Sequence, residues 1–297
     1  MDHTVAALLC VLVVGVFGEQ TPAFDRTDVP AITLLDWMSY LPDNLPLSSL
    51  SIPGTHDTMA LYGGTLAECQ SWSLRNQFNA GVRLLDIRPR HYQDRLPIFH
   101  GVSYQRTTFN EVLKDTVTFL KDHPSETVLM RVKEEYEPFQ NTRSYYKSIA
   151  EVVGEIGEQW FIRSSSLPTL GEARGKIIIL QQFSSNGEGP DFGPPYPGRM
   201  SISDEYQVSD DAVKWAEVER HLNVAQNGDP EKTYITYCSG THWLLYTPES
   251  LARKINPRVL DYLNTKTSAG RRRSMGVVVM DFPGAELIRQ IVLDNWA

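Results

Sequence analysis

The sequence predicts an α/β protein of the (β/α)8 barrel class, irregular or incompletely closed. Three observations support this prediction. Short apolar runs alternate with amphipathic stretches of helical length along the chain. Eight of the apolar runs have the length of a strand, which is the number that closes a parallel barrel. Loops rich in glycine and proline replace some of the helices, which favours an irregular barrel.

The size and charge of the chain limit what it can be. It has 297 residues, 41% of them hydrophobic, and neither a linker nor an internal repeat divides it. We therefore expect one barrel domain over residues 19–297. The formal net charge of -8 argues against nucleic acid as a partner and against strong non-specific attraction to anionic membranes.

Residues 1–18 have the features of a secretory signal peptide. An apolar run of 13 residues, 5–17, is too short to span a bilayer and is followed by Gly18. The first residues are not basic, so a buried N-terminal helix is the open alternative. No later segment has the length and hydropathy of a transmembrane helix. We expect cleavage near Gly18 and a secreted, extracellular protein.

Cysteine usage leaves one question open. Cys10 lies in the predicted leader, and Cys69 and Cys238 remain. In a secreted chain they form one disulfide or stay as two buried thiols. No Cys/His cluster has the spacing of a zinc site, so the sequence predicts no metal ligands and no cofactor.

The elements follow in order, judged by periodicity and by the breakers that end them. Gly81 ends the first helix, Pro124 follows the second, and the run at 175–182 has a continuous apolar centre, 177–180, as in a strand buried on both faces. The predicted strands are 47–52, 82–88, 96–99, 127–133, 175–182, 200–206, 234–238 and 276–281. The predicted helices are 66–80, 109–123, 145–156, 210–223, 248–263 and 284–294.

Polar residues follow many of these strands at their C-terminal ends. In a parallel barrel all such ends meet at one mouth, where active sites lie. The residues concerned are His56, Asp57, Asp86, Arg88, His100, Lys133, Asp204 and Asp281. Two histidines and an arginine suit cleavage of a phosphodiester by an internal hydroxyl. One imidazole takes a proton, the other gives one, and the guanidinium stabilises the phosphate charge.

Three blocks, residues 50–57, 81–88 and 99–101, together resemble the X-domain of bacterial-type phosphatidylinositol-specific phospholipase C. The resemblance continues in order through the later strands and so implies a catalytic barrel over residues 19–297. It implies that His56 is a general base oriented by Asp281, and that His100 is a general acid helped by Asp57. Arg88 would bind the phosphate.

The same resemblance implies a substrate and its contacts. Lys133, Asp204 and Tyr206 match positions that contact the inositol ring, and the products would be diacylglycerol and inositol 1,2-cyclic phosphate. The first motif has Asp57, where calcium-dependent relatives have asparagine, and the second ends in Arg88. A metal-independent enzyme is therefore expected. Gln182 departs from the pattern, because the bacterial enzymes tend to carry a basic residue there.

The expected partner is phosphatidylinositol or a glycosylphosphatidylinositol lipid at a membrane surface, bound peripherally by a monomer. Two other functions stay open: a catalytically altered X-domain protein that binds phosphoinositol headgroups, and another barrel phosphodiesterase. The apolar segment 243–246 is interpreted as core packing, with an exposed membrane-binding rim as the alternative.

Overall fold

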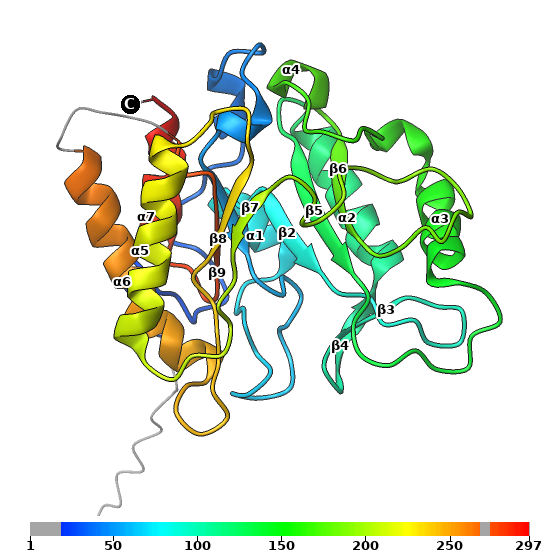
Figure 1. The fold of residues 1–297 in the computed structure, drawn as a ribbon, viewed down its shortest axis with the longest axis horizontal. Coiled ribbons are helices and arrows are strands. Elements are labelled where there is room, and N and C mark those ends of the chain that lie inside the picture. Colours follow the sequence, from blue (N-terminus) through cyan, green and yellow to red (C-terminus); the bar gives the residue numbers. More distant parts are fainter. Residues whose placement is uncertain (1–18, 268–273, 297) are drawn as a thin grey trace, which may run out of the picture.

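The structure, a computed structural model, describes residues 19–267 and 274–296, so the predicted signal peptide lies outside the described residues. Its centre is a curled parallel sheet (Figure 1). The strands are β1 (Ile52–Thr55), β2 (Leu84–Ile87), β5 (Val128–Lys133), β6 (Ile177–Gln182), β7 (Ser201–Ser203), β8 (Tyr234–Tyr237) and β9 (Val277–Met280). Their lateral order is β6-β5-β2-β1-β9-β8-β7, and each neighbouring pair is parallel.

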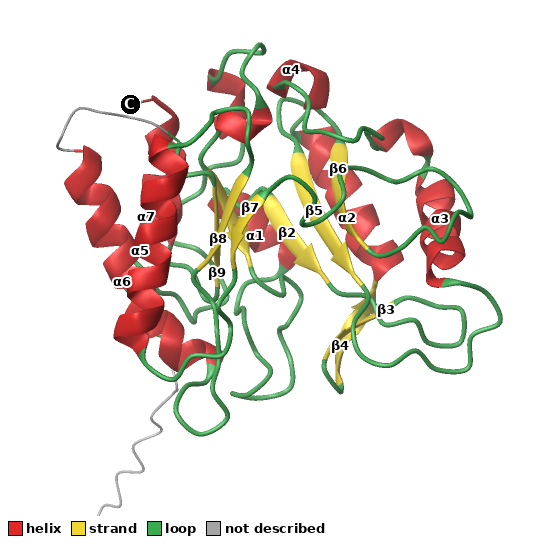
Figure 2. Cartoon of the chain, viewed as in Figure 1, coloured by secondary structure: helices red, strands yellow, loops and turns green. Residues whose placement is uncertain are grey.

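Helices cover the outside of this sheet, and long loops gather where its strands end (Figure 2). The helices α5, α6 and α7 lie together beside β8 and β9, whereas α2 and α3 lie beside β5 and β6 (Figure 1). All of these strands except β7 are almost entirely buried, as expected for parallel strands covered on both faces. The helices are α1 (Leu74–Ala80), α2 (Phe109–Asp122), α3 (Tyr145–Ile156), α4 (Leu170–Ala173), α5 (Asp211–Asn227), α6 (Pro248–Thr267) and α7 (Ala285–Leu293).

The barrel class and its incomplete closure are confirmed, but the third predicted strand is not part of the sheet. It is β3 (Pro97–His100), which pairs antiparallel with β4 (Ser103–Thr108) in a separate hairpin. The connection at Gly101 is too short for a crossover, and parallel neighbours need one of a dozen residues or more. The sheet therefore has seven strands, with β6 and β7 at its two ends.

Two predicted boundaries near the first strand are wrong. The segment Leu47–Ser49 is a 3-10 helix, and β1 starts only at Ile52. Helix α1 begins at Leu74, where the Ser73 side chain accepts from the backbone N–H of Asn76. The preceding residues, expected to be helical, form a loop, in which the N–H groups of Cys69 and Gln70 donate to the carbonyl of Ala60.

Gly54 shows why β1 can lie so close to β2. A Cβ at this position would be 3.0 Å from Cδ2 of Leu84 and 3.3 Å from its carbonyl oxygen. Gly81 closes α1 with φ of 110°, a left-handed conformation that favours glycine. Both glycines fix how the chain enters the strands that bear the site.

The question left open for the cysteines is answered by the fold: Cys69 and Cys238 are buried free thiols. The core interpretation of segment 243–246 is wrong for Trp243, Leu244 and Leu245, whose exposed fractions are 79%, 68% and 57%. Their loop follows β8, at the mouth of the sheet. Among the residues described, the helices are all too short or too polar to cross a bilayer.

Candidate active site

A pocket of about 540 Å³ opens at the C-terminal edge of the sheet. Every candidate catalytic or inositol-binding residue lines it except Asp57, which is fully buried beside it. The fold thus brings together side chains at the ends of β1, β2, β5 and β9 and from the β3 hairpin. The lining residues are His56, Leu66, Arg88, His100, Gly101, Arg131, Lys133, Glu135, Gln182, Asp204, Tyr206, Gly240, Thr241, Pro248 and Asp281.

His56 follows β1 and is paired with Asp281, which follows β9. Its Nδ1 lies 2.9 Å from Oδ1 of Asp281. The Gln70 side-chain amide donates to the carbonyls of His56 and Met280 and so ties the two strand ends together. Burial acts to lower the pKa of His56, but the neighbouring carboxylates of Asp281 and Asp86 together outweigh it, and the pKa is raised.

His100 ends β3 and lies opposite His56. The two ring centroids are 6.5 Å apart, with the rings perpendicular. Nδ1 of His100 donates to the carbonyl of Ala67 at 2.7 Å, while its Nε2 lies 3.7 Å from Oδ2 of Asp57. Each histidine therefore lies beside its own aspartate. Asp57, although next to His56 in sequence, lies beside His100.

Asp57 is held in an unusual environment. Its backbone has φ of 38°, in the left-handed region, and neither carboxylate oxygen has a hydrogen-bond partner in the described structure. Burial raises the pKa of this carboxyl. Strained residues and unsatisfied buried groups concentrate at functional sites.

Arg88 lies two residues beyond Asp86, which anchors it. Its Nη2 donates to Oδ2 of Asp86 at 2.8 Å, and its Nη1 lies 3.5 Å from Oδ2 of Asp57. Asp86 also pairs with Arg131 at 3.3 Å. Although burial opposes it, the two guanidiniums hold the pKa of Asp86 well below its ordinary range. Arg88 is thereby a fixed cation at the base of the pocket.

The three predicted inositol contacts lie at different depths. Lys133, at the end of β5, is half-buried, and burial together with nearby Arg88 lowers its pKa. Asp204 and Tyr206 follow β7 on the open side of the pocket, and both are exposed. Together they surround the space that the histidines face.

Comparison with known proteins agrees with this geometry. The family model described as "Phosphatidylinositol-specific phospholipase C, X domain" matches residues 44–183. The 1-phosphatidylinositol phosphodiesterase of Listeria monocytogenes is 31% identical over 99% of this chain and 98% of its own length. The chain belongs to the phosphatidylinositol-specific phospholipase C family. It is an enzyme of the phosphodiesterase class.

Solved structures of this phospholipase C family have the same fold. The Listeria monocytogenes enzyme superposes with a TM-score of 0.78 at 32% identity, covering 89% of this chain and 99% of its own. A Staphylococcus aureus phosphatidylinositol-specific phospholipase C, at 21% identity, has a TM-score of 0.76 over 88% of this chain and 97% of its own. At that identity the likeness concerns the fold alone.

Sequence reasoning missed Arg131, which lies inside the apolar run of β5. The Nε of Arg131 donates to Oε1 of Gln182 at 2.7 Å, and its Nη1 donates to the hydroxyl of Tyr237 at 2.9 Å. A basic residue thus lines the pocket beside the glutamine that departs from the family pattern. A charge within a buried strand was the available signal, because such a residue needs a partner.

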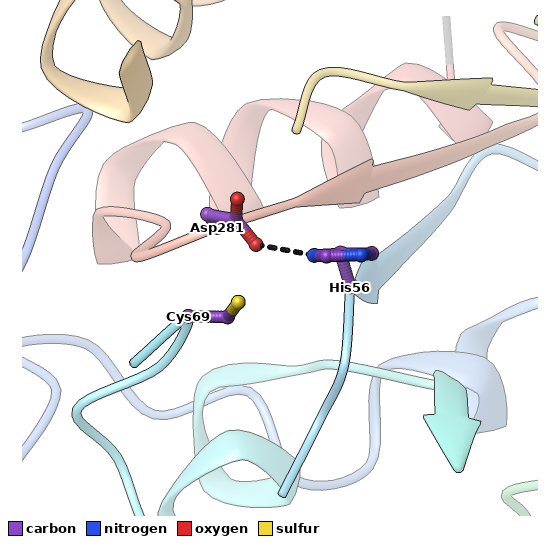
Figure 3. A group of neighbouring side chains, drawn as sticks. All are labelled: His56, Cys69 and Asp281. Atoms are coloured by element: carbon purple, nitrogen blue, oxygen red, sulfur yellow. Dashed lines mark hydrogen bonds and ion pairs between the residues drawn. The ribbon is translucent and has the colours of Figure 1, made fainter. Parts of the chain in front are cut away.

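Cys69 was also missed as a neighbour of the site. It lies in the loop before α1, beside His56 and Asp281 (Figure 3). One ligand-capable atom from each of these three residues lies within 4.8 Å of the others. Residues so far apart in sequence show no metal-ligand spacing, which is why the sequence excluded a cluster that the fold assembles.

Proposed function

We propose that this protein cleaves the phosphodiester of phosphatidylinositol by attack of the inositol 2-hydroxyl on phosphorus. The observation that best supports this is the pair of histidines facing one pocket, each beside its own aspartate. The relative from Listeria has the name 1-phosphatidylinositol phosphodiesterase. The products would be diacylglycerol and inositol 1,2-cyclic phosphate.

His56 is the proposed general base. Because its Nδ1–H donates to Asp281, the lone pair of Nε2 is free to take the proton of the 2-hydroxyl. The imidazolium that forms is stabilised by the same carboxylate, the arrangement found behind catalytic histidines in other enzymes. A general base of this kind contributes about 10²–10⁴-fold in rate.

His100 is the proposed general acid. The new bond joins the 2-oxygen to phosphorus, and the bond from phosphorus to the diacylglycerol oxygen breaks. Nε2 of His100 gives its proton to that leaving oxygen, while the bond from Nδ1 to the Ala67 carbonyl keeps the ring oriented. Asp57, whose Oδ2 lies 3.7 Å from Nε2, is the proposed helper of His100.

Arg88 is proposed to bind the phosphate and to neutralise the charge that develops on it. Asp86 orients the guanidinium before substrate arrives, so its reorganisation costs little during the reaction. A fixed guanidinium performs the electrostatic work that a metal ion performs in many phosphodiesterases. We therefore propose catalysis without a metal ion.

Lys133, Asp204 and Tyr206 are proposed to bind the inositol ring, the tyrosine by stacking on it. Arg131 orients Gln182, so that the amide nitrogen of the glutamine is left to donate to an inositol hydroxyl. This arrangement supports recognition of the headgroup without a basic residue at position 182.

The exposed tip Trp243–Leu244–Leu245 is proposed to enter the membrane interface, where tryptophan is favoured. It follows Gly240 and Thr241, which line the pocket, so insertion would bring the pocket to the lipid surface. Trp243→Ala should lower activity on vesicles by about 10-fold, the effect of roughly 1.5 kcal/mol of burial, but spare a water-soluble inositol phosphodiester. Val224→Ala, an exposed apolar residue near the C-terminal end of α5, is the matched control, and equal losses on both substrates would contradict the proposal.

Three wider expectations belong to the same proposal. The apolar leader supports a secreted enzyme, and residues 19–297 would form its single barrel domain. We propose a monomer that acts peripherally on phosphatidylinositol or on glycosylphosphatidylinositol lipids.

Incubation with phosphatidylinositol vesicles, followed by phosphorus NMR, tests the function. In excess EDTA the wild type should release the cyclic phosphate, and His56→Ala should not. His123→Ala, at the distant C-terminal end of α2, is the control. Vesicle binding without product in EDTA or calcium would favour the headgroup-binding alternative, and product only with calcium would refute metal-independent catalysis.

A further inference from the structure

The segment that bears Cys69 is fixed against the ends of two strands. The Cys69 N–H donates to the carbonyl of Ala60, and the Phe282 N–H donates to the carbonyl of Cys69. The thiol is fully buried and points toward His56 and Asp281 (Figure 3). Its position is therefore set by the backbone that builds the catalytic mouth.

Two atoms of this cluster lack strong partners. Oδ2 of Asp281 is buried without a hydrogen bond in the described structure. The Cys69 sulfur makes two long hydrogen bonds in the part of the chain described, to the Ala67 carbonyl at 3.9 Å and to Nδ1 of His100 at 4.0 Å. Buried polar atoms are normally satisfied, so a buried carboxylate oxygen without a hydrogen bond, beside a thiol with only long ones, points to a ligand.

The donor set selects the ligand. A thiolate, an imidazole nitrogen and a carboxylate oxygen are the atoms that bind Zn²⁺, in sites with three protein ligands and one open position. Calcium and magnesium prefer oxygen ligands alone. The open position would face the pocket, because His56 and Asp281 both line it.

We propose that His56, Cys69 and Asp281 form an inhibitory site for Zn²⁺ or a similar thiophilic divalent cation. The cation takes the place of the proton that Nδ1 of His56 shares with Asp281, and the Cys69 proton leaves to solvent. The displaced Nδ1 proton moves to Nε2 of the same ring, and Nε2 can then no longer accept a proton from a hydroxyl. The inhibitory part rests on the proposed function, whereas the binding part does not.

Binding is measured first, without reference to activity. The purified full chain, freed of metal with EDTA and exchanged into buffer, is titrated with Co²⁺. A thiolate-to-cobalt charge-transfer band should appear and should be displaced by Zn²⁺. Cys238→Ser, which alters the other buried thiol, should keep the band, and Cys69→Ser should lose it. Absence of the band in the wild type, or its persistence in Cys69→Ser, overturns the proposal.

Inhibition is then expressed for each protein relative to its own activity in EDTA. Zn²⁺ should inhibit the wild type and Cys238→Ser reversibly. Inhibition of Cys69→Ser should need at least about 10-fold more Zn²⁺, since even outer-shell partners of metal ligands are worth 10–100-fold in affinity. Equal inhibition of all three proteins refutes the site. A cobalt band in a protein that never hydrolyses phosphatidylinositol would refute the proposed function and leave the cation site standing.

Discussion

Buried charges lie at both ends of β2, but their hydrogen bonding differs. At the base, Arg83 pairs with Glu126 at 2.9 Å, and both side chains are fully buried. Its remaining N–H groups donate to backbone carbonyls, including those of Phe78 and Val82, and it lies over the Phe119 ring. At the mouth, oxygens of Asp57, Asp86 and Asp281 have no hydrogen-bond partner among the described residues.

The difference separates scaffold from site. A buried ion pair with all its hydrogen bonds made has no capacity left for a ligand, and removing one partner leaves an uncompensated buried charge. A cluster with unsatisfied acceptors has been left incomplete, and a ligand or substrate group can complete it. Burial and charge alone would not distinguish the two ends of the strand.

The largest effect is expected at the mouth. His100→Ala should slow cleavage of phosphatidylinositol by about 10²–10⁴-fold, the usual value of a general acid. The rate of cleavage of a substrate with a nitrophenolate leaving group should fall much less, because that group departs without a proton. Steady-state kinetics on both substrates measure this, and His123→Ala is the control. Equal losses on the two substrates would exclude His100 as the acid.

At the base, Glu126→Gln should cost about 3–5 kcal/mol of unfolding free energy, because Arg83 is left as an uncompensated buried cation. The kcat of the protein that remains folded should be unchanged, since the pair lies far from the pocket. Denaturant unfolding and kinetics measure the two quantities. A stable variant would show that the pair is not the anchor its contacts indicate.

Asp281→Asn tests the coupling of His56 to its partner. The carboxylate raises the pKa of His56, so its removal should lower that pKa and keep the base neutral at lower pH. The acid limb of the kcat/KM profile should therefore move to lower pH, with a fall in kcat from the lost orientation. An acid limb that stays in place would exclude Asp281 as the source of the shift.

The smallest effect is expected for Asp57→Asn, the matched counterpart of Glu126→Gln. Asparagine tolerates the left-handed backbone, and the variant removes a buried carboxylate without hydrogen bonds, so stability should rise by about 0.5–2 kcal/mol. Since burial raises the pKa of Asp57, ionisation of this carboxyl destabilises the folded state above that pKa. The gain should be full at neutral pH, decline as pH falls through the raised pKa and vanish below the ordinary pKa of an aspartate, and activity should drop. Destabilisation like that of Glu126→Gln would erase the contrast between the two ends.

The sequence by itself determined the order of the elements and the edge at which the site lies. Parallel strands all end on the same side, so His56, Arg88, Lys133 and Asp281 had to meet there once their strands were recognised. Alternation of apolar runs with amphipathic stretches is a local signal, and α3 begins and ends at the predicted residues. The seventh and eighth predicted strands, which became β8 and β9, were also placed within about two residues.

Only the tertiary structure decided what lies beside what. Lateral strand order put β9 next to β1 and so paired Asp281 with His56, while Asp57 turned toward His100. A short turn diverted the third strand into a hairpin, and the long loop before α1 delivered Cys69 to the mouth. These outcomes depend on contacts between residues distant in sequence, which local periodicity does not encode.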